Sequence, residues 1–241
     1  AESAFRIVAE FKDATGRKLK AELNKRYKSE EEAMAFVNGC TAATFTVEAL
    51  TKKPAKRTPA APFTTSTLQQ EASRKLGFSV TQTMVVAQRL YESGKITYMR
   101  TDSTNLSDTA INSSKEVIPA MFGEEYLKNR RYSKKSKGAQ EAHEAIRPTN
   151  LNVREVGGER NEQRLYDLIW KRTLATQMAD AELERTTLTI GVSNSDAKFI
   201  AKGEVIRFDG FLKLYVEGTD DDLEDAEDSG IIPPLKKGED L

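Results

Sequence analysis

Segments with the composition of β-strands occur near both ends of the chain, and segments with helical periodicity fill the middle. β-Branched and aromatic residues with a period of two are typical of strands, whereas apolar residues three or four apart are typical of helices. We expect strands at residues 4–12, 18–26, 41–51, 186–192, 198–206 and 211–216. This order predicts an α+β fold: one split β domain, formed by the first and last segments, with a mainly helical domain inserted.

Capping residues define where the helices are expected to begin. Ser29 precedes three glutamates, which predicts a helix at residues 30–37. Trp170 lies in the apolar stripe of the last expected helix, so we expect it in the hydrophobic core rather than stacked on a base. In the middle of the chain we expect helices that begin at Thr65 or Ser66, at Ser79 or Thr81 and at Ser107, and two more at residues 140–146 and 161–178.

Residues 52–62 combine three prolines with four basic side chains, a composition typical of a stiff linker. Two interpretations stay open: a solvated connector, and a hinge that contacts phosphate. We place a domain boundary in this stretch and a second one where β-strand character returns. The predicted domains are residues 1–57, 58–183 and 184–241, the first and third being parts of one β domain.

The composition limits the classes of protein to which the chain can belong. Of its 241 residues, 38% are hydrophobic and 31% are charged, and no apolar run is long enough to span a membrane, so we expect a cytoplasmic protein with no membrane partner. The single cysteine, Cys40, excludes an internal disulfide and a zinc site made of cysteines alone. The net charge is zero, which argues for a local basic surface rather than a uniformly basic one.

Residues 95–100 are rich in β-forming residues and predict a short strand. Side chains alternate along a strand, so Tyr98, Arg100 and Asp102 would share one face with Ile96. This face would carry a hydroxyl, a fixed cation and a carboxylate together. The alternative is a buried strand tyrosine beside a surface salt bridge.

The phenol of an unperturbed tyrosine has a pKa of about 10 and is a poor nucleophile at neutral pH. Attack on a phosphodiester also requires that charge on the phosphoryl oxygens be stabilised. Arg100 suits this task because a guanidinium is permanently charged and donates several hydrogen bonds.

His143 is the only histidine, and a lone histidine is structural more often than it is functional. If residues 140–146 are helical, His143 and Arg147 lie on one helix face. The basic run at residues 128–137 has two interpretations, a loop near DNA phosphate and a solvated charge run.

Three blocks of the sequence together resemble those of bacterial type IA DNA topoisomerases. The blocks are residues 61–70 (APFTTSTLQQ), residues 89–92, 94 and 96–107 (RLYE, G, ITYMRTDSTNLS) and residues 141–148 (EAHEAIRP). Their order along the chain is also that of the family. Three independent blocks make a chance agreement very improbable, and the resemblance extends over nearly the whole chain.

The resemblance implies both a fold and an activity. The split β domain would be the arch of these enzymes, and the inserted domain would be a winged helix of the catabolite-activator kind that bears the catalytic tyrosine. Tyr98 would attack one strand of negatively supercoiled DNA and hold its 5′ end as a phosphotyrosine, with Arg100 stabilising the phosphate. The other strand would pass through before the break is resealed.

The remaining candidate residues follow from the same blocks. His143, held by a carboxylate such as Asp102, would bind phosphate as an imidazolium. Thr101, Ser103 and Arg147 would bind DNA phosphate or support the loop around it. We expect no metal ligands in this chain.

The family also has a toprim domain, whose acidic cluster binds Mg²⁺, and no such motif occurs in this sequence. We therefore expect a central fragment that is inactive alone, with single-stranded or negatively supercoiled DNA and the remaining domains of the enzyme as partners. Two alternatives are a non-catalytic winged-helix DNA-binding module and a protein-interaction fragment that binds no nucleic acid. Salt-dependent binding to single-stranded DNA would exclude the latter.

Overall fold

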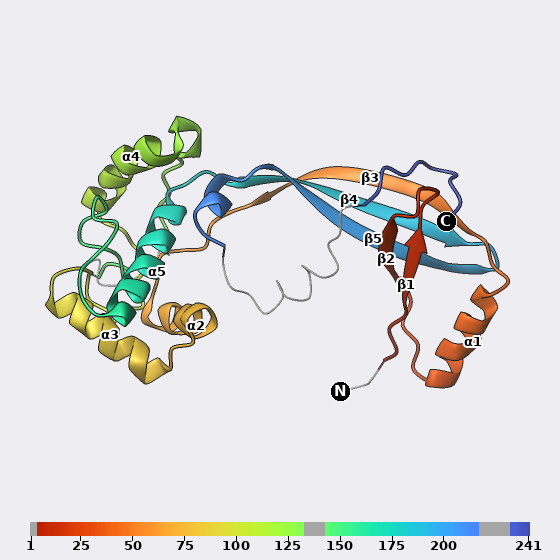
Figure 1. Cartoon of the computed structure of the whole chain (residues 1–241), viewed down its shortest axis with the longest axis horizontal. Helices are drawn as coiled ribbons and strands as arrows, with labels where there is room; N and C mark the ends of the chain where they lie inside the picture. The colour runs from red at the N-terminus through yellow and green to blue at the C-terminus, as the bar shows by residue number, and fades with distance from the viewer. Residues whose placement is uncertain (1–3, 133–142, 217–231) are drawn as a thin grey trace, which may run out of the picture. The chain divides into compact units, whose positions relative to one another are not determined.

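The computed structural model describes residues 4–132, 143–216 and 232–241 of the chain. The chain divides into two compact units, each built from segments that are distant in the sequence (Figure 1). The basic run beyond Tyr132 and the start of the helix predicted at residues 140–146 lie outside the described residues. The first unit comprises Ala1–Ala55, Glu182–Arg207 and Thr219–Leu241, and the second comprises Lys56–Ala181 and Phe208–Gly218.

The first unit contains a five-stranded sheet in the order β1-β2-β5-β4-β3. β1 (Val8–Lys12) pairs antiparallel with β2 (Lys18–Leu23), and β2 pairs antiparallel with β5 (Ser195–Phe208). The other strands are β3 (Phe45–Arg57) and β4 (Ala181–Val192). The sheet therefore joins strands from both ends of the chain, and five of the six predicted strands are present.

Aromatic rings form the centre of the core of the first unit. Phe11 contacts Phe45 and Phe199 edge-on, with ring centroids 5.2 and 5.4 Å apart. Helix α1 (Glu30–Cys40) of this unit is capped, as predicted, by Ser29, whose hydroxyl accepts a hydrogen bond from a backbone N–H in the first turn.

Four α-helices lie in the described part of the second unit. Each of them is preceded by a residue in extended conformation, and hydroxyl side chains cap α2, α3 and α4 at Thr64, Ser79 and Ser107. The helices are α2 (Thr65–Leu76), α3 (Val80–Glu92), α4 (Asp108–Phe122) and α5 (Arg160–Thr176). Short 3₁₀ helices occur at Glu124–Tyr126 and Gly210–Lys213.

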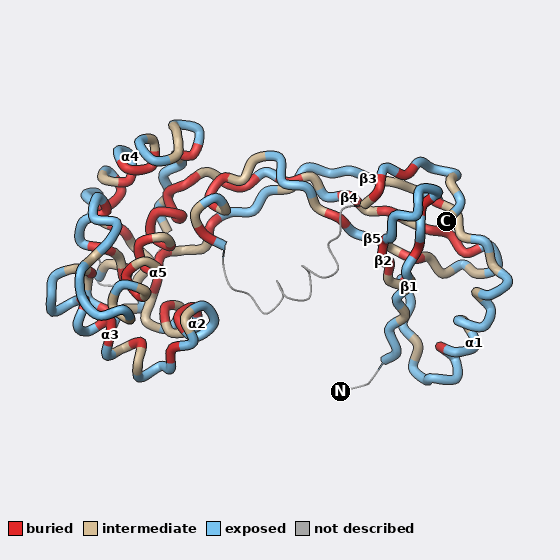
Figure 2. The backbone as a smooth tube through the Cα atoms, in the orientation of Figure 1, coloured by how far each residue is buried: buried red, intermediate tan, exposed pale blue. Residues whose placement is uncertain are grey.

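The core of the second unit is organised around α5, most of which is buried (Figure 2). Trp170 is fully buried, and its indole N–H donates a hydrogen bond of 2.9 Å to the carbonyl of Leu151. The prediction that Trp170 is a core residue is therefore confirmed.

Within the described residues, no helix is both long and apolar enough to cross a membrane.

The prediction of a strand at residues 211–216 is wrong. This stretch begins in a 3₁₀ helix and belongs to the second unit, where the Tyr215 hydroxyl donates a hydrogen bond of 2.8 Å to buried Glu71. Gly210 has a φ of 50°, and a Cβ there would lie 2.3 Å from the carbonyl oxygen of Asp180. The close approach requires glycine and turns the chain away from the sheet.

The prediction of a linker at residues 52–62 is also wrong for its first half, because β3 continues to Arg57. Pro54 lies within β3, which is an edge strand of the sheet. An edge position tolerates proline, since a missing N–H there need not break a ladder.

Candidate active site

A glycine turn after α3 brings the chain back toward the core and presents Tyr98. Gly94 has a φ of 69°, and the N–H of Lys95 donates to the carbonyl of Leu90 at 2.8 Å, which closes the end of the helix. Ile96 and Met99 are buried, whereas the side chain of Tyr98 is 47% exposed. The backbone is thus anchored on both sides of an exposed phenol.

The strand predicted at residues 95–100 is absent, and only an isolated bridge joins Ile96 to Pro148. Ile96 is buried and Tyr98 is exposed, so they do not share a face as predicted. The reason is that bends interrupt the alternation of side chains.

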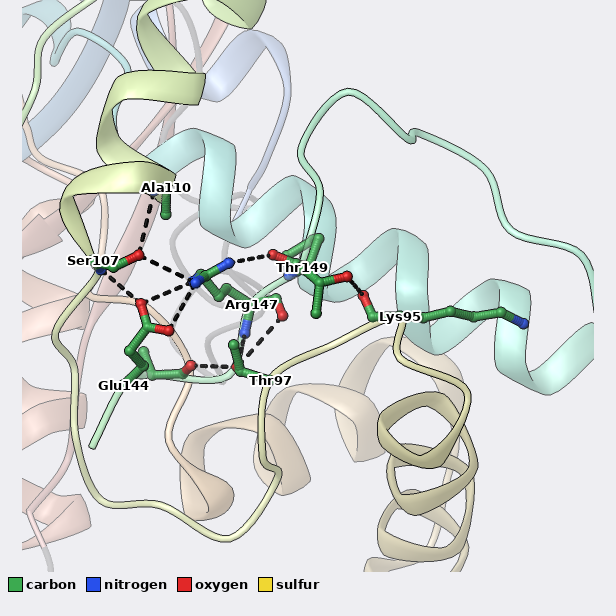
Figure 3. A network of polar contacts seen from close by, with 9 residues as sticks. Lys95, Thr97, Ser107, Ala110, Glu144, Arg147 and Thr149 are labelled. Atoms are coloured by element: carbon green, nitrogen blue, oxygen red, sulfur yellow. Dashed lines mark hydrogen bonds and ion pairs between the residues drawn. The ribbon is translucent and has the colours of Figure 1, made fainter. Parts of the chain in front are cut away.

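One side of this segment is hydrogen-bonded to residues 145–149 (Figure 3). The N–H of Thr97 donates to the carbonyl of Arg147 at 2.9 Å, and the Thr97 hydroxyl donates to the carbonyl of Ala145 at 2.6 Å. The N–H of Thr149 donates to the carbonyl of Lys95 at 3.0 Å. These bonds satisfy the backbone polar groups on this side without a regular ladder.

Thr65 holds the other side of the segment and was not predicted as a site residue. Its N–H donates to the carbonyl of Thr101 at 2.9 Å, and its hydroxyl accepts from the N–H of Thr101 at 2.9 Å and lies 2.8 Å from the carbonyl of Met99. Sequence reasoning treated Thr65 only as a possible helix cap, a role that Thr64 has instead. The run of hydroxyl residues in the block at 61–70 was the available signal.

Four of the predicted site residues line one open cleft of about 390 Å³, together with two hydroxyl residues at the start of α2. Among the described residues, no hydrogen bond or ion pair joins Asp102 to His143, and Arg100 has no hydrogen-bonded or ion-paired partner. An open cleft with a cation, an imidazole and several hydroxyls suits a phosphate group. The lining residues are Thr65, Ser66, Arg100, Thr101, Asp102 and His143.

Thr101 and one further candidate residue, Ser103, shape the loop that follows Arg100. The hydroxyl of Thr101 accepts a hydrogen bond of 3.1 Å from the N–H of Ser103, and the hydroxyl of Ser103 accepts one of 3.1 Å from the N–H of Asn105. Both are hydroxyl turns that use a side-chain oxygen in place of a backbone partner. Ser103 is not among the residues that line the cleft.

The guanidinium of Arg147 is hydrogen-bonded to other groups of the protein (Figure 3). Its guanidinium makes two hydrogen bonds to Glu144, at 3.0 and 2.7 Å, one of 3.1 Å to the Ser107 hydroxyl and one of 2.9 Å to the carbonyl of Pro148. Its side chain is only 12% exposed. Arg147 therefore braces the loops around the site in this structure.

Glu144 joins this brace to the first turn of α4. Its carboxylate accepts a hydrogen bond of 2.7 Å from the N–H of Ser107, the cap of that helix. Burial raises the pKa of Glu144, but hydrogen bonds from Arg147 and Ser107 outweigh burial, so the pKa lies below its ordinary value. Sequence reasoning did not single out Glu144, although it lies in the block EAHEAIRP.

The helix predicted at residues 140–146 does not occur over its described part. The N–H of Ala145 donates to the carbonyl of Asn105, and the N–H of Ile146 donates to the carbonyl of Phe63, both at 2.8 Å. Because these donors are paired with other segments, the stretch is extended. His143 and Arg147 therefore do not lie on one helix face.

The described part of the basic run is largely paired with acidic groups. Lys128 and Arg130 both form ion pairs with Asp180, and Arg131 pairs with Asp108. Burial raises the pKa of Asp180, but Lys128 and Arg130 outweigh burial and lower it. These contacts fix the segment that follows the 3₁₀ helix at Glu124–Tyr126.

The cleft does not fit a Mg²⁺ ion. Among its lining residues Asp102 is the only carboxylate, and no group of three or more His, Cys, Asp or Glu residues in the described part of the chain could hold a metal ion. Mg²⁺ in proteins is bound through carboxylates and water in octahedral geometry.

Comparisons with known proteins identify the family to which the chain belongs. The family model described as DNA topoisomerase matches residues 1–241. DNA topoisomerase 1 of Synechocystis sp. is 49% identical over 216 residues, and that of Streptomyces coelicolor is 47% identical over 229 residues. The chain belongs to the DNA topoisomerase family. Its similarity to the bacterial type IA topoisomerases, drawn above from three sequence blocks, is confirmed by these relatives.

The matches cover most of this chain and a small part of each relative. The alignments span 87% and 90% of this chain and 24% of each of the two curated relatives. The solved structure of full-length topoisomerase I from Thermotoga maritima superposes with a TM-score of 0.75 at 32% identity, covering 99% of this chain and 39% of that one. The mixed α/β fold with its antiparallel pairing is thus that of a topoisomerase I.

Proposed function

We propose that this chain is the central, tyrosine-bearing segment of a type IA DNA topoisomerase, an isomerase that relaxes negatively supercoiled DNA. The observation that supports this most directly is the exposed Tyr98 on an anchored turn, two residues before Arg100 in a cleft that His143 also lines. Tyr98 is not itself among the residues that line the cleft. A phenol two residues along the chain from a permanent cation, with an imidazole in the same cleft as that cation, suits attack on a phosphodiester.

In the proposed reaction, the hydroxyl oxygen of Tyr98 attacks a backbone phosphorus of one DNA strand. A P–O bond to Tyr98 forms and the bond from phosphorus to the 3′ oxygen breaks; the phenol loses its proton and the 3′ oxygen gains one. The 5′ end stays on Tyr98 as a phosphotyrosine while the other strand passes. Attack by the 3′ hydroxyl then reverses the step, so no external energy source is needed.

Arg100 and His143 are proposed to bind the phosphate that Tyr98 attacks. Negative charge on the phosphoryl oxygens grows in the transition state, and a preorganised guanidinium in the cleft stabilises it. His143 would add a second donor to the phosphate when protonated, and Asp102 lines the same cleft. Thr101 and Ser103 are proposed to hold the loop, and Arg147 to brace it.

The domain assignment is part of the same proposal. Residues 1–57 and 184–241 would form a split β arch, and residues 58–183 would form a winged-helix domain of the catabolite-activator kind. The helix pair α2 and α3, followed by the turn at Gly94, supports the second assignment. The described residues 208–216 group with the helical unit, so we propose that the third segment of the chain contributes them to that domain.

The partners of the chain are also proposed. They are single-stranded or negatively supercoiled DNA and the remaining domains of the enzyme, in the cytoplasm. We propose Mg²⁺ as a cofactor of the complete enzyme, with its acidic ligands in the toprim domain of the family.

The test uses the complete enzyme and a single-stranded oligonucleotide labelled at its 3′ end. This end belongs to the piece that would stay attached to Tyr98 through its 5′ phosphate. Denaturation after the reaction leaves the label on the protein only if a covalent bond has formed. Tyr98→Phe removes only the hydroxyl, so we expect it to bind the oligonucleotide and form no adduct. The matched control is Tyr91→Phe, which removes one hydroxyl from a nearby exposed tyrosine and should retain the adduct.

Two results would contradict the proposal. An adduct with the Tyr98→Phe enzyme would assign the nucleophile to another residue. Binding without any adduct in the unmodified enzyme, at every ionic strength tested, would support the alternative of a non-catalytic winged-helix DNA-binding module.

A further inference from the structure

The backbone on either side of Tyr98 is fixed, but its side chain is not held by polar contacts. Ile96 and Met99 are buried, and Thr97 is hydrogen-bonded to the segment at residues 145–149. Among the described residues, the Tyr98 hydroxyl has no hydrogen-bond partner. Staggered rotamers of a half-exposed side chain interconvert readily unless a neighbour selects one of them.

Tyr91 is the neighbour that contacts the ring of Tyr98. The two ring centroids are 5.2 Å apart and the planes meet at 67°, an edge-to-face arrangement. Such pairs are more favourable than the burial of their area alone accounts for. The contact restricts where the Tyr98 ring can lie.

The backbone of Tyr91 is itself held in place by its helix and by the turn that follows. It lies in the last turn of α3, and the carbonyl of Tyr91 accepts a hydrogen bond of 2.8 Å from the N–H of Gly94. The left-handed conformation of Gly94 reverses the chain, and this brings Tyr98 back beside the helix. The adjacent Leu90 is fully buried, which anchors this turn of the helix in the core.

We propose that Tyr91 is a positioning residue for the nucleophile: its ring selects the rotamer in which the Tyr98 hydroxyl meets the scissile phosphate. This inference rests on the proposed function. The ring of Tyr91 is sufficient for the role, and its hydroxyl is not required. A nucleophile held in one rotamer reacts faster than one distributed among several, without binding DNA more tightly.

The test compares three variants of the complete enzyme in single-turnover cleavage of a single-stranded oligonucleotide. Tyr91→Ala removes the ring, Tyr91→Phe keeps it, and Val85→Ala alters another half-exposed side chain on α3 as a matched control. We expect Tyr91→Ala to lower the cleavage rate at saturating DNA by about 2- to 12-fold, the range that corresponds to one aromatic pair. Its Kd for the oligonucleotide and its melting temperature should match those of Val85→Ala.

A second measurement does not depend on activity. With 3-fluorotyrosine at position 98, the fluorine resonance should be a single narrow line in the unmodified enzyme and in Tyr91→Phe. It should broaden or split in Tyr91→Ala, because several ring orientations become populated.

The outcomes separate this inference from the proposed function. If Tyr91→Ala cleaves as fast as Val85→Ala while Tyr98→Phe forms no adduct, the inference is wrong and the proposed function stands. A weaker Kd with an unchanged rate would overturn the inference in favour of base stacking by Tyr91. If Tyr91→Phe is as slow as Tyr91→Ala, the hydroxyl has the role and the ring does not. If the unmodified enzyme forms no adduct, the proposed function itself has failed.

Discussion

The ion pair between Glu144 and Arg147 links two loops of the site, and we expect it to contribute measurably to stability. Glu144→Gln keeps the size of the side chain and an oxygen that can accept from the N–H of Ser107, but it removes the charge. Arg147→Met removes the guanidinium and keeps most of the apolar stem. A double-mutant cycle over these two changes isolates the energy of the pair.

The magnitude follows from the geometry. The pair has two short N–H to oxygen contacts, 2.7 and 3.0 Å, and its side chains are 12% exposed at Arg147 and 31% exposed at Glu144. A hydrogen bond to a charged group contributes about 1.5–3 kcal/mol, and solvent screening at Glu144 reduces the sum. We expect a coupling energy of about 1–2 kcal/mol at neutral pH.

The pH dependence has a definite sign. The pKa of Glu144 is lower in the folded protein than its ordinary value of 4.5, because the hydrogen bonds from Arg147 and Ser107 outweigh burial. A lowered folded pKa means that the stabilisation is fully present above the unfolded pKa and is lost as the pH falls through the folded pKa. The cost of Glu144→Gln should therefore be constant above about pH 5.5 and shrink progressively below pH 4.5.

Denaturant unfolding of the four proteins of the cycle, at neutral and acidic pH, gives these energies. The matched control is the ion pair of Asp167 and Lys171 on the surface of α5. The Lys171 Nζ and Asp167 Oδ2 atoms are 2.6 Å apart, and the side chains are 44% exposed at Asp167 and 34% exposed at Lys171. Asp167→Asn and Lys171→Met should show a coupling of about 0.3–0.5 kcal/mol, the value for exposed helical pairs. If the Glu144–Arg147 coupling is no larger than this, the reasoning from burial is refuted.

Three further predictions concern the reaction. Arg100→Ala should lower single-turnover cleavage by about 100-fold or more while changing oligonucleotide binding much less, because the guanidinium acts on charge that develops in the transition state; an equal loss of binding would contradict this role. His143→Ala should weaken binding of single-stranded DNA in a mobility-shift titration, and more so at lower pH, where the imidazole is protonated; a loss that is independent of pH would indicate a structural role. The 241-residue chain by itself should not relax negatively supercoiled plasmid in the presence of Mg²⁺. Relaxation by this chain, but not by its Tyr98→Phe variant, would show that every essential group lies within it.

Local signals in the sequence predicted the parts of the fold that depend on neighbouring residues. Ser29 and Ser107 were identified as helix caps, and Ser79 was one of two candidates for a third; all three are caps in the structure. A cap is a contact between residues three apart, so its energy is determined within one turn. Trp170 was assigned to the core from the periodicity of its helix for the same reason.

The predictions that were wrong fall where distant segments supply the hydrogen bonds. The stretch at residues 95–100 was predicted as a strand, but it is held by Thr65 on one side and by residues 145–149 on the other. The stretch before Pro148 was predicted as a helix, but its N–H groups pair with Phe63 and Asn105. Propensity describes what a segment prefers alone, and these contacts override it.

The candidate site shows the same contrast between local sequence signals and contacts from distant segments. The sequence by itself determined which chemical groups are available, because Tyr98, Arg100 and His143 belong to short blocks that can be read without a fold. Only the tertiary structure decided how two arginines differ: Arg100 lines the cleft, whereas Arg147 is bonded to Glu144 and Ser107. Ser107 and Glu144 are 37 residues apart, and no local pattern predicts that they meet. A guanidinium takes its role from the partners that folding brings to it, and here those partners come from distant parts of the chain.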